Sequence, residues 1–193
     1  MPNQSNKRED VLNAALAIIA EQGFHAAPIS QIAEKANIGA GTIYRYFKSK
    51  EELINALYLE VRKRMAQEIL KGQDTSGSVY EQFVRYMQNL ISYLIEHPTE
   101  IQFTEQYENS PFVTEATRGE VNKIASPISD LFIRAREAHM LKNLPFQVIM
   151  TLLSGASMAL LKTCMHGELP TSQIDSAIDA IWDMLTRKDG FKQ

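Results

Sequence analysis

Four side chains in one short stretch of the sequence carry groups that bind nucleic acids. Within five residues the chain presents Thr42, Tyr44, Arg45 and Tyr46, which supply one hydroxyl, two phenols and one guanidinium. Groups of this kind donate hydrogen bonds to phosphate oxygens and read the edges of bases. On a helix the four would project over about one and a half turns. The stretch therefore predicts a surface that contacts DNA.

The flanking residues predict two short helices joined by a tight turn. Ile32 and Ala33 fall on one face of the first helix, and Ile43 and Phe47 are spaced to anchor the second helix to a core. Asn37 stands where the chain must reverse, and asparagine enters the left-handed backbone region at low cost. This order of elements predicts a helix-turn-helix DNA reader over residues 30–50.

The second of these helices opens with Gly39, Ala40 and Gly41, three residues with little or no side chain. Backbone amides at such a helix start can approach a phosphate closely, and the helix dipole favours negative charge there. We expect these three residues to lie against the DNA.

The same residues resemble the N-terminal signature of the TetR family of one-component repressors. The resemblance is carried by Ile32-Ala33, by the run from Gly41 to Phe47 and by the run from Ser49 to Leu53. It implies a three-helix DNA-binding head on an all-helical body that binds a ligand and dimerises. By motif position it implies DNA-binding roles for Thr42, Tyr44, Arg45 and Tyr46, a phosphate-anchoring role for Lys50, and close approach at Gly39, Ala40 and Gly41.

The N-terminal part departs from the family pattern in two places. Family members commonly carry glycine where this chain has Asn37, and often a Thr or Ser cap for the second helix where it has Ala27-Pro28. The second departure places a phosphate contact from that cap in question. Upstream, Lys7 and Arg8 are either a basic arm that contacts phosphates or solvated charges at a frayed end.

Composition excludes disordered and fibrous proteins, because 45% of the 193 residues are hydrophobic and 22% are charged. The net charge of −3 conceals an asymmetry. Residues 1–64 contain nine Lys or Arg against seven Asp or Glu, a net charge of +2, and the remainder contains 11 against 16, a net charge of −5. A basic head and an acidic body suit a protein that lays one end on phosphates.

We expect a cytoplasmic protein without a membrane span. The single Cys164 cannot form an intrachain disulfide, and no charged and then apolar signal segment opens the sequence. The most apolar stretch, residues 146–161, is shorter than the roughly 18 residues of a spanning helix and is interrupted by polar residues. It predicts a buried helix.

Apolar periodicity along the rest of the chain predicts an all-α fold. We expect residues 1–50 to form the helix-turn-helix DNA-binding domain and residues 51–193 a helical ligand-binding and dimerisation domain. The resemblance implies that the long fourth helix, which carries Arg62-Lys63-Arg64 as solvated surface, converts ligand binding into a change in head separation. Predicted helices cover residues 9–22, 51–71, 79–97, a shorter segment around 101–107, 114–139 with a kink at Ser126-Pro127, 145–166 and 172–187.

Aromatic and methionine residues of the body are candidates for a small-molecule site, since such side chains give an adaptable apolar lining. The same residue types are also ordinary core, and packing remains the alternative for each of them. The candidates are Phe83, Tyr86, Met87, Tyr93, Phe103, Tyr107 and Phe132.

The last two predicted helices are candidates for a homodimer interface, because the final one repeats apolar residues at every turn and the one before it is apolar nearly all round. Two such helices from each protomer would form a four-helix bundle about a two-fold axis. Two heads on that axis predict a palindromic operator in double-stranded DNA. The candidate interface residues are Leu153, Ala156, Leu160, Ile174, Ile178, Ile181, Trp182 and Leu185.

Catalysis has little support in the sequence, and we expect no cofactor or metal. His25, His97, His139 and His166 lack the spacing of a metal site, and no nucleophile signature or phosphate-binding glycine loop occurs. Three functions remain: a ligand-responsive repressor, an architectural or protein-regulated DNA binder without a small-molecule effector, and a helical enzyme or carrier. The acidic, aromatic-rich body favours the first, with a small lipophilic effector.

Overall fold

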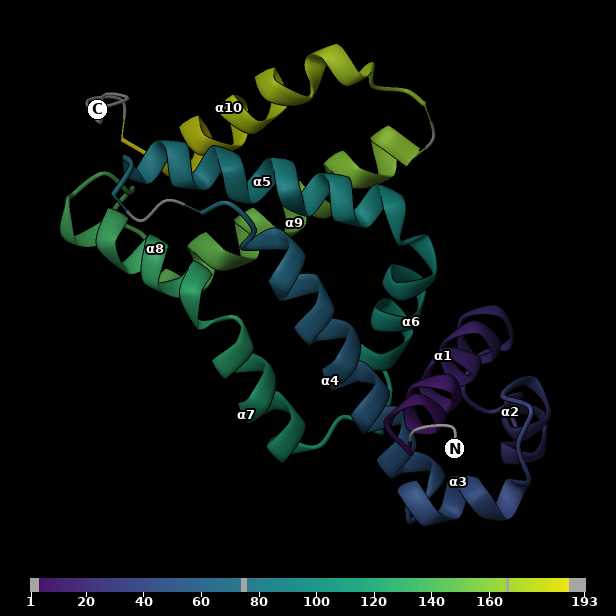
Figure 1. The fold of residues 1–193 in the computed structure, drawn as a ribbon. Coiled ribbons are helices and arrows are strands. Elements are labelled where there is room, and N and C mark those ends of the chain that lie inside the picture. Colours follow the sequence, from purple (N-terminus) through teal and green to yellow (C-terminus); the bar gives the residue numbers. More distant parts are fainter. Residues whose placement is uncertain (1–3, 74–75, 166, 188–193) are drawn as a thin grey trace. The chain divides into compact units, whose positions relative to one another are not determined.

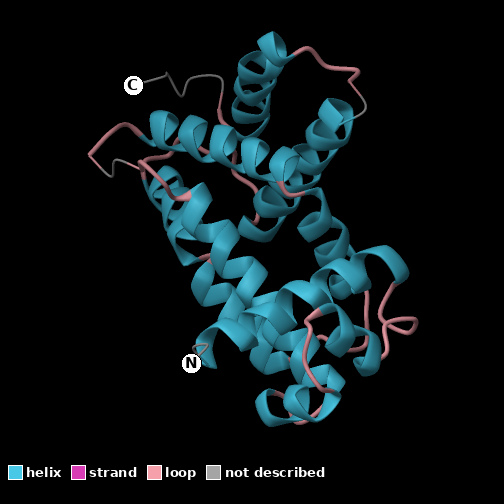
Figure 2. Cartoon of the chain, turned by 45° about the vertical axis from the view of Figure 1, so that its right-hand side comes forward, coloured by secondary structure: helices cyan, strands magenta, loops and turns pink. Residues whose placement is uncertain are grey.

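The computed structural model describes residues 4–73, 76–165 and 167–187, and every regular element within them is a helix (Figures 1 and 2). This confirms the all-α prediction. The helices are α1 Gln4–Gln22, α2 Ile29–Lys35, α3 Ala40–Tyr46, α4 Lys50–Ile69, α5 Val79–Glu96, α6 Pro98–Glu108, α7 Glu115–Ile124, α8 Ser126–Glu137, α9 Phe146–Met165 and α10 Ile174–Leu185, preceded by a short 3₁₀ turn at Thr171–Gln173.

Two helices differ most from the sequence-based prediction. Helix α1 begins at Gln4, so that Lys7 and Arg8 lie within it and not before it. The long helix predicted over residues 114–139 is two helices, which meet at Ala125. Pro127 explains the break, because proline lacks the amide hydrogen of a helix interior and its ring clashes with the preceding turn.

The chain forms two compact units. The first comprises Met1–Arg64 and His97–Ile124, and the second comprises Met65–Glu96 and Ala125–Gln193. Helix α4 passes from the first unit into the second. The predicted boundary at residue 50 concerns a division of function and stays a prediction, whereas these units are defined by packing.

The core of the first unit joins the N-terminal helices to α6. Helix α1 packs against α2, α3 and α6, and buries Leu12, Ala15 and Ile19. Phe103 and Tyr107 of α6 are fully buried in the same cluster. The three N-terminal helices therefore share one core with α6.

A polar cluster fastens α4 to the segment from α6 to α7 in the first unit. The Asn55 side-chain amide donates to the carbonyl oxygens of Glu51 and Phe112, at 2.8 and 2.9 Å. Its oxygen accepts hydrogen bonds from the hydroxyls of Tyr107 and Thr117, both at 2.6 Å. All the hydrogen-bonding capacity of this one amide is thus used.

Two ion pairs also join α4 to α6, which corrects the expectation that Arg62 and Arg64 are solvated. Arg64 contacts Glu100 at 2.8 Å, and this carboxylate is largely buried. Arg62 lies 3.8 Å from Glu108, which also accepts a hydrogen bond from Tyr58 at 2.9 Å. Periodicity could not reveal these partners, because they are distant in sequence.

In the second unit, α5 packs against α8, α9 and α10, and α9 packs against α10 (Figure 1). An aromatic cluster lies at the centre of this packing. The Phe83 ring lies 4.9 Å from Trp182 and 6.1 Å from Phe132, measured between ring centroids, and all three side chains are buried. Tyr80 packs edge-on against Trp182 and donates a hydrogen bond to Asp179.

Candidate nucleic-acid interface and effector body

The turn between α2 and α3 has the predicted geometry. Asn37 has a φ of 53°, in the left-handed region, as its residue type indicated. The backbone amides of Asn37 and Ile38 donate to the carbonyls of Glu34 and Ala33, both at 3.0 Å. These two hydrogen bonds close the end of α2 and direct the chain into α3.

Helix α3 divides its side chains between the core and solvent. Ile43 within the helix and Phe47 directly after it are buried, which confirms their anchoring role. Tyr44 is 55% exposed, the highest value among the exposed large apolar side chains of the described chain, and Arg45 is also exposed. The phenol and the guanidinium therefore both point away from the core on the helix that the sequence predicts to contact DNA.

The other two predicted contacts on α3 are less open. Thr42 and Tyr46 are half-buried, and the Tyr46 ring packs 6.4 Å from that of Phe47, measured between ring centroids. Part of the Tyr46 side chain therefore packs on the core, and the rest is exposed.

The start of α3 is unobstructed. Gly39 caps the helix with an extended backbone, and the amide of Thr42 donates to its carbonyl at 2.8 Å. A Cβ added at Gly41 would meet no atom within 4 Å, and one at Gly39 would meet only the Thr42 hydroxyl, at 4.0 Å. Packing within the chain does not require glycine at Gly41, which leaves its surface free for an outside partner. Ala40, between them, is exposed.

Lys50, the predicted phosphate anchor, makes a hydrogen bond within the chain. Its ammonium donates a hydrogen bond to the carbonyl of Phe24, in the turn after α1. Burial lowers the pKa of this lysine, because desolvation disfavours the charged form. Exposed Lys48 lies two residues before it.

Sequence profiles of known families match both parts of this architecture. Residues 11–57 match the tetR family of bacterial regulatory proteins, and residues 79–186 match the tetracyclin repressor-like C-terminal domain. The second match covers more than half of the chain. The chain belongs to the TetR family. It is therefore a DNA-binding helix-turn-helix transcriptional regulator of a family that is not enzymatic.

Individual relatives of this TetR-family chain agree with that assignment. An uncharacterised helix-turn-helix transcriptional regulator of Haemophilus influenzae is 31% identical over 103 residues, which are 53% of this chain and 55% of the relative. The chain thus spans little more than half the length of this curated relative.

Solved structures confirm the fold. A TetR-family regulator from Marinobacter aquaeolei superimposes with a TM-score of 0.88 and 22% identity, covering 95% of this chain and 97% of that one. The regulator FadR of Bacillus subtilis, solved with stearoyl-CoA, superimposes with a TM-score of 0.70 and 18% identity, covering 95% and 98%.

The seven predicted effector-binding residues of the TetR-family body fall into two groups. Phe103 and Tyr107 lie in the core of the first unit, where Tyr107 stacks on Tyr58 with ring centroids 3.9 Å apart. The second group belongs to the second unit; four of its side chains are buried and that of Tyr86 is half-buried. It consists of Phe83, Tyr86, Met87, Tyr93 and Phe132. The seven residues thus divide between the two units.

Most of the predicted dimer residues are covered by their own chain. Ala156 and Ile174 are half-buried, and the other six are buried where α9 and α10 pack on each other and on α5. Those six are Leu153, Leu160, Ile178, Ile181, Trp182 and Leu185. The apolar stripe of α10 is therefore a core stripe of the protomer. Periodicity identifies an apolar face but not which chain covers it.

The other face of α9 leaves an apolar stripe open. Val148 and Leu152 are 40% and 37% exposed, and Gly155 and Ala159 continue the same helical face in solvent. Contrary to the expectation of a buried segment too short to span a membrane, α9 has 20 residues and is long and apolar enough to do so by length and composition alone, with a mean hydropathy of 1.6 and 22% burial over the relevant window. Since the C-terminal family profile covers α9, the helix belongs to the regulatory domain.

No group of three or more His, Cys, Asp or Glu side chains that could hold a metal occurs within residues 4–73, 76–165 and 167–187. His166, one of the four histidines considered from the sequence, lies outside these residues. Asn55 could not be recognised from the sequence as the centre of a polar cluster, because three of its four partners are 52 to 62 residues away.

Proposed function

We propose that this TetR-family regulator is a repressor that binds a palindromic operator as a homodimer and is released by a small lipophilic molecule. The observation that carries the proposal is the outward face of α3, where Tyr44 and Arg45 project from a helix with an unobstructed glycine start. A phenol and a guanidinium so placed can read base edges in a major groove. Residues 1–50 would then hold the DNA contacts, and residues 51–193 effector binding and dimerisation, in the cytoplasm.

We place the proposed contact between the two protomers on the open face of α9. Val148, Leu152, Gly155 and Ala159 are spaced at four, three and four residues and form one apolar stripe. Its two small residues allow a second helix to approach closely. An isologous contact along this stripe would set two reading helices on a two-fold axis, as a palindromic operator requires.

The effector proposal rests on the second unit and on a relative. Met87 is fully buried beside Ser157, whose hydroxyl lies 3.7 Å from the methionine sulfur, and methionine repacks readily around apolar ligands. FadR of Bacillus subtilis was solved with stearoyl-CoA. We infer a lipophilic effector, with an acyl-CoA as the first class to test, among Phe83, Tyr86, Met87, Tyr93 and Phe132. Phe103 and Tyr107 act as core.

The alternative is a DNA binder regulated by another protein, or an architectural one, without a small-molecule effector. The tightly packed aromatic cluster of Phe83, Phe132 and Trp182 favours it, because a ligand would have to displace buried rings. Release of DNA by a small molecule separates the two.

Selection of duplexes from a random-sequence pool tests the DNA-binding part. We expect the wild-type protein to enrich one inverted repeat, and Tyr44→Ala and Arg45→Ala to bind that repeat more weakly while keeping the wild-type mass in solution. Enrichment of unrelated sequences, or unchanged affinity in both variants, would exclude α3 as the reading helix.

A further inference from the structure

Most of helix α4 is fastened to the first unit. The Asn55 amide cluster holds one part of this stretch, and the ion pair between Arg64 and Glu100 holds its far end. Arg64 is the last residue of α4 that belongs to the first unit. Helix α3 shares the core of the same unit through Ile43. A displacement of α4 would therefore carry α3 with it.

The chain passes between the two units at three places, and only one of them lies inside a helix. One crossing follows Arg64 within α4, whereas the others fall at His97, before α6, and at Ala125, between α7 and α8. Residues at the ends of elements absorb most of the backbone rotation in hinge motions, while a continuous helix keeps its ladder of hydrogen bonds. Helix α4 is therefore the stiffest of the three connections.

The C-terminal end of α4 is held in the second unit by one side chain of α5. The Asn89 side-chain amide donates to the carbonyl oxygens of Ile69 and Lys71, both at 2.9 Å. Ile69 is the last residue of α4, and carbonyls at a helix end lack partners within the helix. The Gln73 side chain adds a contact to the Gln82 carbonyl at 3.3 Å. The segment from Ile69 to Gln73 is thus bonded to α5.

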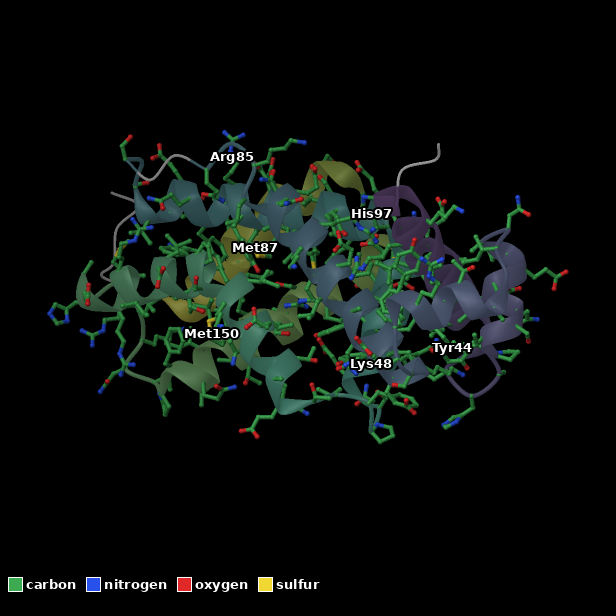
Figure 3. The ribbon with its side chains drawn as sticks, turned by 60° about the horizontal axis from the view of Figure 1, so that its bottom comes forward. Tyr44, Lys48, Arg85, Met87, His97 and Met150 are labelled. Atoms are coloured by element: carbon green, nitrogen blue, oxygen red, sulfur yellow. The ribbon has the colours of Figure 1, made fainter. Side chains whose placement is uncertain are left out.

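Helix α5 also carries four of the five proposed effector-binding residues of the second unit, and Asn89 follows two residues after one of them. In Figure 3, Met87 lies among the helices of the second unit, whereas Arg85 on the same helix points outward. An effector that repacks the inner side of α5 would shift this helix, and Asn89 with it. The four residues are Phe83, Tyr86, Met87 and Tyr93.

We infer that Asn89 is a positioning residue through which an acyl-CoA bound against α5 moves the end of α4. Both donors of one side-chain amide are committed to a single short segment of backbone, so this segment must follow α5. The inference rests on the proposed effector response, and it names the residue by which that response leaves α5.

Two substitutions remove these donors with little change in volume. Asn89→Leu has no polar group, and the carboxylate of Asn89→Asp cannot donate to a carbonyl. The probe is stearoyl-CoA, added to the duplex that the wild-type protein selects, and operator affinity is followed by fluorescence anisotropy at a temperature where each variant is folded. We expect stearoyl-CoA to weaken wild-type binding by about 5- to 150-fold and binding by both variants by less than about threefold.

Binding of stearoyl-CoA to the DNA-free protein is measured alongside. The inference predicts that both Asn89 variants keep the wild-type affinity for stearoyl-CoA, because Asn89 acts after the effector has bound. A purely structural role would lower the melting temperature and leave the response of operator affinity to stearoyl-CoA unchanged.

Gln88→Leu is the matched control. Gln88 precedes Asn89 on α5 and is also half-buried, and its amide donates to the Asp175 carboxylate of α10 at 3.0 Å. The substitution thus removes a hydrogen bond between α5 and another helix of the second unit, but not one to α4. We expect Gln88→Leu to keep the full response to stearoyl-CoA.

The outcomes separate this inference from the proposed function. Wild-type operator affinity that stearoyl-CoA leaves unchanged overturns the proposed acyl-CoA response and this inference with it. A wild-type response that persists in Asn89→Leu and Asn89→Asp overturns the inference alone. Loss of stearoyl-CoA binding in both variants also overturns it, because Asn89 would then act at the effector site. An equal loss of response in Gln88→Leu overturns it as well, because the route through α4 would not be specific.

Operator affinity without acyl-CoA is the last check. Folded Asn89 variants should still bind the duplex, because the first unit is unaltered. Folded variants that no longer bind it would overturn the inference, since Asn89 would then be required for DNA binding itself.

Discussion

At the scale of single residues, a substitution at Gly41 should affect folding and DNA binding in different ways. A side chain at this position would extend into open space. Gly41→Leu should therefore keep or raise stability, by about 0.5 kcal/mol, because leucine favours helix more than glycine does. The same side chain would hold the start of α3 away from the DNA, so we expect loss of operator binding. Thermal unfolding and anisotropy measure the two effects; a stable variant with wild-type affinity would mean that the backbone at Gly41 does not approach DNA.

A substitution at Asn55 should change the stability of the fold. Asn55→Leu leaves the hydroxyl of Tyr107 without its acceptor and removes one of the two partners of the Thr117 hydroxyl, and both residues are buried. An unsatisfied buried polar group costs about 1–3 kcal/mol. We therefore expect the free energy of unfolding, measured in urea, to fall by about 2 kcal/mol.

The same substitution at exposed Asn143 is the control for Asn55 and should change stability by less than about 0.5 kcal/mol. Equal, small effects at both positions would show that the Asn55 cluster contributes little.

At the scale of helices, the open face of α9 predicts the dimer contact. Leu152→Glu places a charge in the middle of that stripe, where it would lose solvation on association. We expect sedimentation velocity to find a monomer with unchanged helix content. Ile133→Glu, at an exposed apolar position on α8, is the control and should remain dimeric. A Leu152→Glu protein that is still dimeric at low concentration would place the interface elsewhere.

Sequence patterns predicted the helices better than their partners. Local rules about turns, glycine and proline predict helices α2 and α3, the left-handed Asn37 and the interruption near Pro127. The structure agrees with all of these. Trp182 and Tyr107 illustrate what local rules omit. Both lie on apolar stripes, but Trp182 is covered by its own protomer and Tyr107 belongs to the core of the first unit. An apolar stripe indicates burial, whereas the partner depends on contacts between residues far apart in sequence.

The candidate DNA site divides in the same way. Tyr44 and Arg45 could be assigned from the sequence, because outward positions on a helix follow from its period. The hydrogen bond of Lys50 could not, since it depends on where the Phe24 carbonyl lies in three dimensions.

At the scale of the whole molecule, the proposed repressor couples the binding of two ligands, DNA and the effector. In the proposed mechanism, DNA favours dimers whose heads match the operator, and an effector favours another shape of the body. Thermodynamic reciprocity then requires each ligand to weaken the other by the same factor, typically a coupling of about 1–3 kcal/mol. Since α4 runs through both compact units, it is the element through which we expect this coupling to act.

The most direct test adds stearoyl-CoA, shorter acyl-CoAs and free CoA to the complex of the wild-type protein with its selected duplex and follows anisotropy. We predict that at least one long-chain acyl-CoA weakens operator affinity by about 5- to 150-fold, that free CoA does not, and that the duplex weakens binding of that acyl-CoA by the same factor. Operator affinity that no acyl-CoA alters would contradict the acyl-CoA assignment, and unchanged affinity across a wider panel of lipophilic molecules would contradict the ligand-responsive repressor itself.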